Sequence, residues 1–254
     1  MDIITSRVND AVLLIKSLMT NIKFRRETGL FAVEGDHLCG ELAERSDLIS
    51  FLYTEKAARK YPETVKKAVE KAQNAAVIAE EISQYISDTI CPQGLFASAK
   101  LFNLEIPENA KKLIVLDSVQ DPGNVGTIIR AAEAFGIDGV LYSPNCADKF
   151  SPKTLRASMG SVFRVPVQLY SDAENLRGYL RGFTAYGAML DETAKRLGEV
   201  KFPEKTAMVI GNEGSGISPE IAALCNEKIY IPIQGAESLN AAMAASILLW
   251  ELSK

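Results

Sequence analysis

The 254-residue sequence is poor in the residues that build disulfide-rich or metal-bound proteins. Its four cysteines stand far apart without a C-x-x-C pair, and histidine occurs once, so we expect neither a disulfide framework nor a metal site. No apolar run approaches the roughly 20 residues that span a bilayer. Residues 1–7 lack the basic-then-apolar order of a signal peptide. These absences favour a protein of the reducing cytoplasm without a membrane partner.

The sequence also lacks a strong excess of positive or negative charge, because the formal net charge is only −4. Hydrophobic residues make up 47% of the chain and charged residues 24%, which is ordinary for a globular protein and excludes a disordered or collagen-like chain. The bulk charge does not indicate a nucleic-acid partner. Local basic patches can still bind phosphate, so the function has to be sought in local motifs.

Turn-forming residues divide the chain near residue 106. A turn signal at 91–94 and the sequence Ile106-Pro107 precede the apolar run 113–116, which is typical of a buried strand. We therefore predict two domains, a small α/β domain over residues 1–105 and a second domain over residues 106–254. In the first domain we expect helices at 9–18 and 63–74 and strands at 30–33, 48–53 and 75–79.

Strands and helices alternate more regularly in the second domain, which predicts a mostly parallel sheet with helices on both faces. Ligands of such sheets bind at the carboxyl ends of the strands, so the loops after residues 116, 210 and 231 are the informative ones. The predicted strands are 113–116, 138–142, 165–169, 184–189, 206–210 and 228–231. The predicted helices are 124–135, 172–181, 218–225 and 240–252.

The first of these loops leads into a helix that carries two polar candidates. Asn124 can cap the helix, and Arg130 lies further along it, where an ion pair with a surface carboxylate is the plain structural interpretation. Gly126 inside the first turn costs helix stability, which usually means that another backbone or a ligand comes close.

The second and third loops are each ambiguous when taken alone. The G-x-x-G-x-G spacing at 211–216 differs from the G-x-G-x-x-G of dinucleotide folds and disfavours a nicotinamide enzyme. In the third loop, Ser238 or Asn240 can cap the last helix, whose small residues suit close packing.

Taken in order, the three loops resemble the three motifs of the SpoU (TrmH-like) family of RNA ribose 2′-O-methyltransferases, which belongs to the SPOUT class. The matching residues are Asn124-x-Gly126-x-x-x-Arg130, Gly211-x-Glu213-x-x-Gly216 and Ile231-Pro232-x-x-Gly235-x-x-Ser238-Leu239-Asn240. This resemblance covers residues 108–254 and implies a trefoil knot, which no periodicity in the sequence indicates. Residues 1–105 resemble the substrate-binding domain of ribosomal-RNA members, through Phe31-x-Val33-Glu34-Gly35 and Pro92-Gln93-Gly94.

The resemblance implies a cofactor and a set of site residues. S-adenosyl-L-methionine would be held by backbone groups at Gly211, Ile231 and Leu239. Arg130 would position an RNA phosphate and stabilise the forming alkoxide, since arginine is a poor base. The catalytic polar cluster would be completed by Asn124, Glu213, Ser238 and Asn240. Members of the family are homodimers, so a second copy of the chain is an expected partner.

Candidate RNA contacts are the basic residues Lys23, Arg25, Arg26, Lys153 and Arg156. The only histidine, His37, lies outside the motifs and is expected at the surface. We predict 2′-O-ribose methylation of ribosomal RNA, with the large-subunit RNA as the expected substrate. Two alternatives stay open: a transfer-RNA 2′-O-methyltransferase, and a non-catalytic RNA-binding factor for ribosome assembly.

Overall fold

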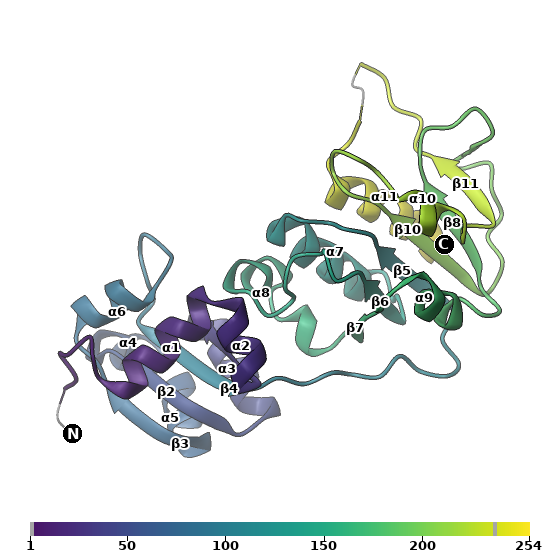
Figure 1. The fold of residues 1–254 in the computed structure, drawn as a ribbon. Helices are drawn as coiled ribbons and strands as arrows, with labels where there is room; N and C mark the ends of the chain where they lie inside the picture. The colour runs from purple at the N-terminus through teal and green to yellow at the C-terminus, as the bar shows by residue number, and fades with distance from the viewer. Residues whose placement is uncertain (1–2, 236–237) are drawn as a thin grey trace. The chain divides into compact units, whose positions relative to one another are not determined.

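The computed structural model describes residues 3–235 and 238–254, and it divides the chain into two compact units (Figure 1). The first unit comprises residues 1–102 and 150–160, and the second comprises residues 103–149 and 161–254. Two residues of the third motif loop, Ala236 and Glu237, lie outside the described part of the chain.

The first unit is built on a four-stranded sheet in the order β1-β4-β2-β3, in which β4 runs antiparallel to β1 and β2 and β3 runs parallel to β2. The strands are β1 (Leu30–Glu34), β2 (Leu48–Tyr53), β3 (Ala72–Val77) and β4 (Leu95–Lys100). The helices are α1 (Asp10–Thr20), α2 (Ile22–Thr28), α3 (Asp36–Arg45), α4 (Glu55–Lys60), α5 (Pro62–Lys71), α6 (Glu80–Ile86) and α8 (Pro152–Ser158).

Local sequence explains the helix that opens this unit. Asn9 caps α1 by accepting a hydrogen bond from the Ala11 backbone N–H at 3.0 Å. Val12, Ile15 and Leu18 recur at helical spacing and are fully buried. The predicted helix at 9–18 and the predicted strands at 30–33 and 48–53 are confirmed. The predicted helix at 63–74 ends early, because its last residues already pair with β2 as the start of β3.

The second unit is built on a seven-stranded, fully parallel sheet in the order β7-β6-β5-β10-β8-β11-β9. Its strands are β5 (Lys112–Leu116), β6 (Gly139–Tyr142), β7 (Val167–Leu169), β8 (Thr184–Ala188), β9 (Lys195–Arg196), β10 (Thr206–Ile210) and β11 (Glu227–Tyr230). Its helices are α7 (Pro122–Ala134), the 3-10 turn η1 (Ser161–Phe163), α9 (Ala173–Tyr179), α10 (Pro219–Ala222) and α11 (Ala241–Ser253).

Helices cover both faces of this sheet, as the alternation along β5 shows. Leu113 and Val115 pack in one core cluster with Leu176 of α9 and Ile221 of α10. The alternate residues of the strand are also buried and point to the other face, while α7 and α11 contact each other and the strands β6 and β10. The predicted α/β class with a parallel sheet is confirmed. The trefoil knot and the domain boundary between residues 105 and 106 stay predictions.

Residues 150–160 belong to the first unit, although the sequence places them in the second domain. In the first unit the Phe150 ring lies 4.6 Å from that of Phe31. The helix α8 in this segment was not predicted. All six predicted strands of the second domain are present, although β7 is shorter than expected and α10 is a single turn.

Candidate active site

The three motif loops start where β5, β10 and β11 end, at one edge of the parallel sheet. The first two loops are joined by Asp117, a buried residue whose carboxylate accepts a hydrogen bond from the Ser218 backbone N–H at 2.7 Å. Asn212 adds a second link, because its side-chain amide donates to the Ser118 carbonyl at 2.8 Å. Asp117 is not among the site residues predicted from the sequence. Its signal was a carboxylate placed directly after a buried strand.

Asp121, and not Asn124, caps α7. The Asp121 carboxylate accepts from the Asn124 backbone N–H at 3.0 Å, and the helix starts at Pro122. The capping role predicted for Asn124 is therefore wrong. Its buried side chain faces inward instead and bonds to two residues from the other motif loops.

These two bonds form a directed chain across the three motifs. Asn240 caps α11, since its side-chain oxygen accepts from the backbone N–H groups of Ala242 and Met243 at 2.9 and 3.3 Å. Its amide nitrogen is then left to donate to Asn124 Oδ1 at 2.9 Å. Asn124 in turn donates from Nδ2 to Glu213 Oε1 at 2.8 Å. The cap on α11 thus sets the orientation of both amides and points a donor at the Glu213 carboxylate.

The Glu213 carboxylate is held in its charged form by this arrangement. Partial burial raises its pKa, but the hydrogen bond from Asn124 and those from the backbone N–H groups of Gln120 and Asp121 outweigh burial and lower the pKa below its ordinary value. Glu213 therefore acts as a charged acceptor for the Asn124 amide. It is not suited to donate a proton near neutral pH.

Arg130 stands apart from this cluster. Its side chain is exposed on α7, and among the described residues it forms no hydrogen bond or ion pair, so the expected pairing with a surface carboxylate is not found. A guanidinium without a partner in its own chain is available to an external anion. The structure does not bring Arg130 into contact with Glu213, Asn124 or Asn240.

A cleft of about 490 Å³ opens beside the second and third loops, a size typical of small-molecule sites. Gly211, Ile231 and Leu239, the three residues predicted to hold a cofactor, all line it, and so do Glu213 and Ser238. Much of the remaining wall is apolar. Ser238 is exposed and does not cap α11, so capping does not explain this hydroxyl.

Comparison with known proteins decides which family carries this site. Residues 111–250 match the sequence model of the SpoU rRNA Methylase family, and residues 9–97 match the MRM3-like substrate binding domain. The chain belongs to the SpoU rRNA methylase family. It is 33% identical over 98% of both chains to the 23S rRNA (guanosine(2553)-2′-O)-methyltransferase RlmP of Bacillus subtilis. It is 30% identical to the mitochondrial rRNA methyltransferase 3 of Mus musculus, over 93% of this chain and 71% of the relative.

Two solved structures share this architecture along the whole chain. The AdoMet-bound rRNA methyltransferase from Sinorhizobium meliloti superimposes with a TM-score of 0.85 at 28% identity, covering 98% of this chain and 96% of the other. The SpoU methyltransferase AviRb from Streptomyces viridochromogenes, in complex with AdoMet, gives 0.84 at 25% identity, over 96% and 97%. The similarity to SpoU methyltransferase structures therefore extends over both units of the chain.

The glycine that opens the second motif of this SpoU chain serves the loop itself. A Cβ at Gly211 would lie 2.1–2.3 Å from backbone atoms of Gly216 and Ile217, because the loop folds back on the strand end. Asn212 and Gly216 close this turn with two backbone hydrogen bonds of 2.9 and 3.0 Å. Glycine is therefore required at position 211 by the crowding of the protein's own backbone.

This crowding yields a matched pair of variants. Gly211→Ala is expected to lower the free energy of unfolding by about 1–3 kcal/mol, because the backbone neighbours cannot move aside as a side chain would. Gly214→Ala is the control, since its Cβ would meet only the Asn212 side chain at 3.7 Å. Urea unfolding of both variants measures the difference. Equal stability of the two would refute the close approach of the loop.

The predicted RNA contacts differ in how far their side chains are exposed. Arg25 is wrong as an RNA contact, because it is 5% exposed and donates to the Leu18 carbonyl at 2.6 Å at the end of α1. Lys23, Arg26 and Lys153 are exposed. Arg156 is partly exposed and forms a two-pronged pair with Asp88 at 2.7 and 2.9 Å.

Among the other sequence expectations, the surface position of His37 is confirmed. Within residues 3–235 and 238–254, no helix is long and apolar enough to cross a membrane. The same part of the chain holds no group of His, Cys, Asp or Glu side chains arranged for a metal ion.

Proposed function

We propose that this chain transfers a methyl group from S-adenosyl-L-methionine to a ribose 2′-hydroxyl of large-subunit ribosomal RNA, in the cytoplasm. The main observation behind this proposal is the series of hydrogen bonds that links Glu213, Asn124 and Asn240. It joins all three motifs and reaches the cleft through Glu213. Its occurrence in a chain related along its full length to a 23S rRNA 2′-O-methyltransferase supports this substrate.

The cleft suits an adenosine-containing cofactor with a positive charge. Ile217, Ile229 and Ile233 give apolar walls for a base, while the loop backbone at Gly211, Ile231 and Leu239 offers hydrogen-bonding groups beside them. The ionised Glu213 carboxylate at the same cleft favours a sulfonium cation. Both AdoMet-bound structural relatives support the same cofactor.

Methyl transfer from this cofactor needs no acid or base to activate the methyl group. When bound, S-adenosyl-L-methionine supplies a methyl group that is already activated, so the protein has to align the hydroxyl and help to remove its proton. A guanidinium is a cation with several N–H donors, which suits Arg130 to hold an RNA phosphate and to stabilise negative charge that develops on the 2′-oxygen. Ser238 and the oriented Asn124 complete the polar surroundings.

Mapping of the methylated nucleotides tests the proposal directly. The purified protein is incubated with isotope-labelled S-adenosyl-L-methionine and either 23S ribosomal RNA or bulk transfer RNA. A single 2′-O-methyl site in the 23S RNA is expected. Label in transfer RNA alone would favour the transfer-RNA alternative. Binding of ribosomal RNA without any methyl transfer would favour an assembly factor instead.

We also propose that the protein is a homodimer, because α11 leaves an apolar stripe on its outer face. Met243, Ile247 and Trp250 recur at helical spacing and are 57%, 36% and 54% exposed, although they are large and apolar. A second copy is the fitting partner, since the helix Ala241–Ser253 itself carries no basic residue to bind RNA phosphates.

A charge placed in this stripe is expected to separate the copies. Trp250→Glu should lower the mass measured by light scattering from twice 27.7 kDa toward 27.7 kDa, because a carboxylate buried between two apolar helix faces opposes association. Ile90→Glu is the control, a charge at a 94% exposed apolar residue of the first unit. A Trp250→Glu protein that keeps the dimer mass would exclude the α11 face as the interface.

A further inference from the structure

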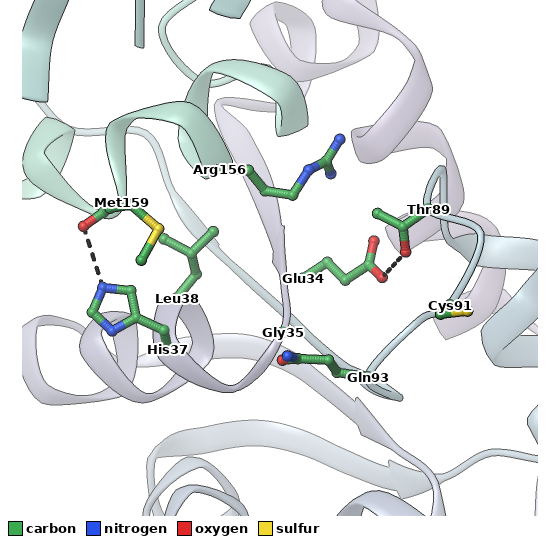
Figure 2. A pocket seen from close by; sticks show the side chains of 9 residues that line it. All are labelled: Glu34, Gly35, His37, Leu38, Thr89, Cys91, Gln93, Arg156 and Met159. Atoms are coloured by element: carbon green, nitrogen blue, oxygen red, sulfur yellow. Dashed lines mark hydrogen bonds between the residues drawn. The ribbon is translucent and has the colours of Figure 1, made fainter. Parts of the chain in front are cut away.

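The first unit contains a second cavity, of about 330 Å³, that the proposed methyl transfer does not use (Figure 2). It lies beside the end of β1 and the start of α3, with the 87–93 loop and α8 along its sides. Its lining residues are Glu34, Gly35, His37, Leu38, Thr89, Cys91, Gln93, Arg156 and Met159.

The cavity holds a buried carboxylate with an unsatisfied oxygen. Glu34 is only 8% exposed, and its Oε1 accepts hydrogen bonds from Ser87 at 2.7 Å and Thr89 at 3.1 Å. Its Oε2 has no hydrogen-bond partner among the described groups. Burial raises the pKa of Glu34 even though the two hydroxyls act in the opposite direction. A buried polar atom without a partner is uncommon in folded proteins and points to a donor from outside the chain.

The two family motifs of the first unit build the floor of this cavity together. Gln93 Oε1 accepts from the Asp36 backbone N–H at 2.7 Å, which ties the 87–93 loop to the start of α3. A Cβ at Gly35 would lie 2.8 Å from that same oxygen, and Gly35 has a φ of 96°. Glycine is therefore required at this position, and Glu34 is held beside it on a rigid strand end.

Hydrogen-bond donors and apolar side chains complete the lining. Arg156 uses its guanidinium on Asp88 through two nitrogens, and that pair is partly exposed, so further N–H groups can serve a ligand. Figure 2 shows Arg156 on the same side as the Glu34 carboxylate, with His37, Leu38 and Met159 grouped to one side of them. His37 Nε2 lies 3.2 Å from the Met159 carbonyl oxygen, which fixes the imidazole at the rim.

We propose that this cavity binds an unpaired guanine base of the RNA substrate, separate from the nucleotide at the methyl-transfer cleft. Guanine carries N1–H and an amino group on the edge that a carboxylate reads, and O6 and N7 acceptors next to them for an arginine. Uracil has one N–H between two carbonyls, which oppose Glu34. Because Oε2 is covered in the structure, a small side-chain movement accompanies binding. The proposal rests on the proposed function only in taking RNA as the ligand.

Cys91 gives a direct measurement of occupancy at this cavity. It lines the cavity and is exposed, whereas Cys39 is buried and Cys146 and Cys225 are partly buried. The full-length protein is alkylated with iodoacetamide in the presence of GMP or UMP, and each cysteine is followed by peptide mass spectrometry. At about 10 mM, tenfold above a Kd of 1 mM, GMP should slow alkylation of Cys91 several-fold. UMP has the same phosphate and should leave the rate unchanged.

Variants assign the effect to Glu34. Glu34→Gln keeps the acceptor for Ser87 and Thr89 but replaces the free oxygen with a donor, so protection by GMP should be lost. Glu44→Gln, a change at an exposed carboxylate of the same unit outside the cavity, should keep it. If Glu34→Gln does not fold, Arg156→Lys is the test variant, because lysine keeps the positive charge but loses the two-pronged set of guanidinium N–H donors. Retained GMP protection in whichever variant is decisive would overturn the proposal.

The outcomes separate this inference from the proposed function. Equal protection by GMP and UMP, or protection by neither, refutes the guanine site even if the wild-type protein methylates 23S RNA. Protection by GMP alone supports the guanine site even if no methyl transfer is found. In methylation assays the same site should appear as a KM for RNA that Glu34→Gln raises about tenfold, with kcat at saturating RNA little changed.

Discussion

Replacing Arg130 with alanine is expected to reduce kcat for methyl transfer by about 10²–10³-fold, the usual cost of losing one group that stabilises developing charge. Arg130 is exposed and has no hydrogen bond or ion pair within the described part of its own chain, so its removal leaves no buried group unsatisfied. We therefore expect the free energy of unfolding and the affinity for S-adenosyl-L-methionine to remain near the wild-type values. Single-turnover methyl transfer and calorimetry measure the two effects separately.

Arg181→Ala is the matched control for this experiment. Arg181 is also an exposed arginine of the second unit, and the structure gives its side chain no partner among the described residues. Arg181→Ala should behave like the wild type in both assays. That result would show that loss of one surface charge is not enough to reduce methyl transfer. An Arg130→Ala protein with nearly normal turnover would show that Arg130 is not needed for methyl transfer. A variant that no longer binds the cofactor would show that Arg130 acts at the cofactor site and not on the RNA.

The sequence predicts the strands of the second unit well because they are short and almost uniformly apolar. Buried parallel strands such as 113–116 and 206–210 have this pattern for a physical reason, since both faces of the sheet are covered. Several other elements were not predicted, and for two of them, β4 and α8, the reason is that their residues lack this apolar pattern. β4 contains alanine and serine at buried positions, and α8 carries Lys153 and Arg156 within a single short helix.

At the site, residue types were easier to predict than their roles. Proline at the first helical position marks Asp121 as the cap of α7, although Asn124 was the predicted cap. Arg25 looks like an RNA contact because of its charge, and only the folded chain shows that the Leu18 carbonyl holds it inside. The directed chain from Asn240 to Glu213 joins residues up to 116 positions apart, so no local pattern contains it.

Asn124→Asp should disable this directed chain with almost no change of shape. Asn124 Nδ2 lies 2.8 Å from Glu213 Oε1, and the substitution replaces that donor with a second carboxylate oxygen. Two carboxylates at this distance cannot both ionise without a large penalty, and one pKa of the pair rises. At pH 8 we expect methyl transfer to fall about 100-fold, which corresponds to about 2.7 kcal/mol. Unfolding in urea should show a loss of about 1–3 kcal/mol.

The pH dependence distinguishes charge repulsion from simple misfolding. In the wild type the pKa of Glu213 is lowered, so its contribution to stability is present above the unfolded value and is lost as pH falls through the folded value. In Asn124→Asp the pKa of one carboxyl group of the pair is raised instead, so the change of stability with pH has the opposite sign. The variant therefore loses stability as pH rises. The gap between the two proteins should therefore narrow as pH falls from about 8 toward about 5.

Asn226→Asp is the control for this titration. The Asn226 side chain accepts from the Ala185 backbone N–H at 2.8 Å, so aspartate keeps that bond and brings no second carboxylate into hydrogen-bond contact. Its stability should follow the wild type across the pH series. If the gap between Asn124→Asp and the wild type is instead the same at every pH, Asn124 does not donate to Glu213 in solution. The orientation passed from the α11 cap to the Glu213 carboxylate would then have no part in catalysis.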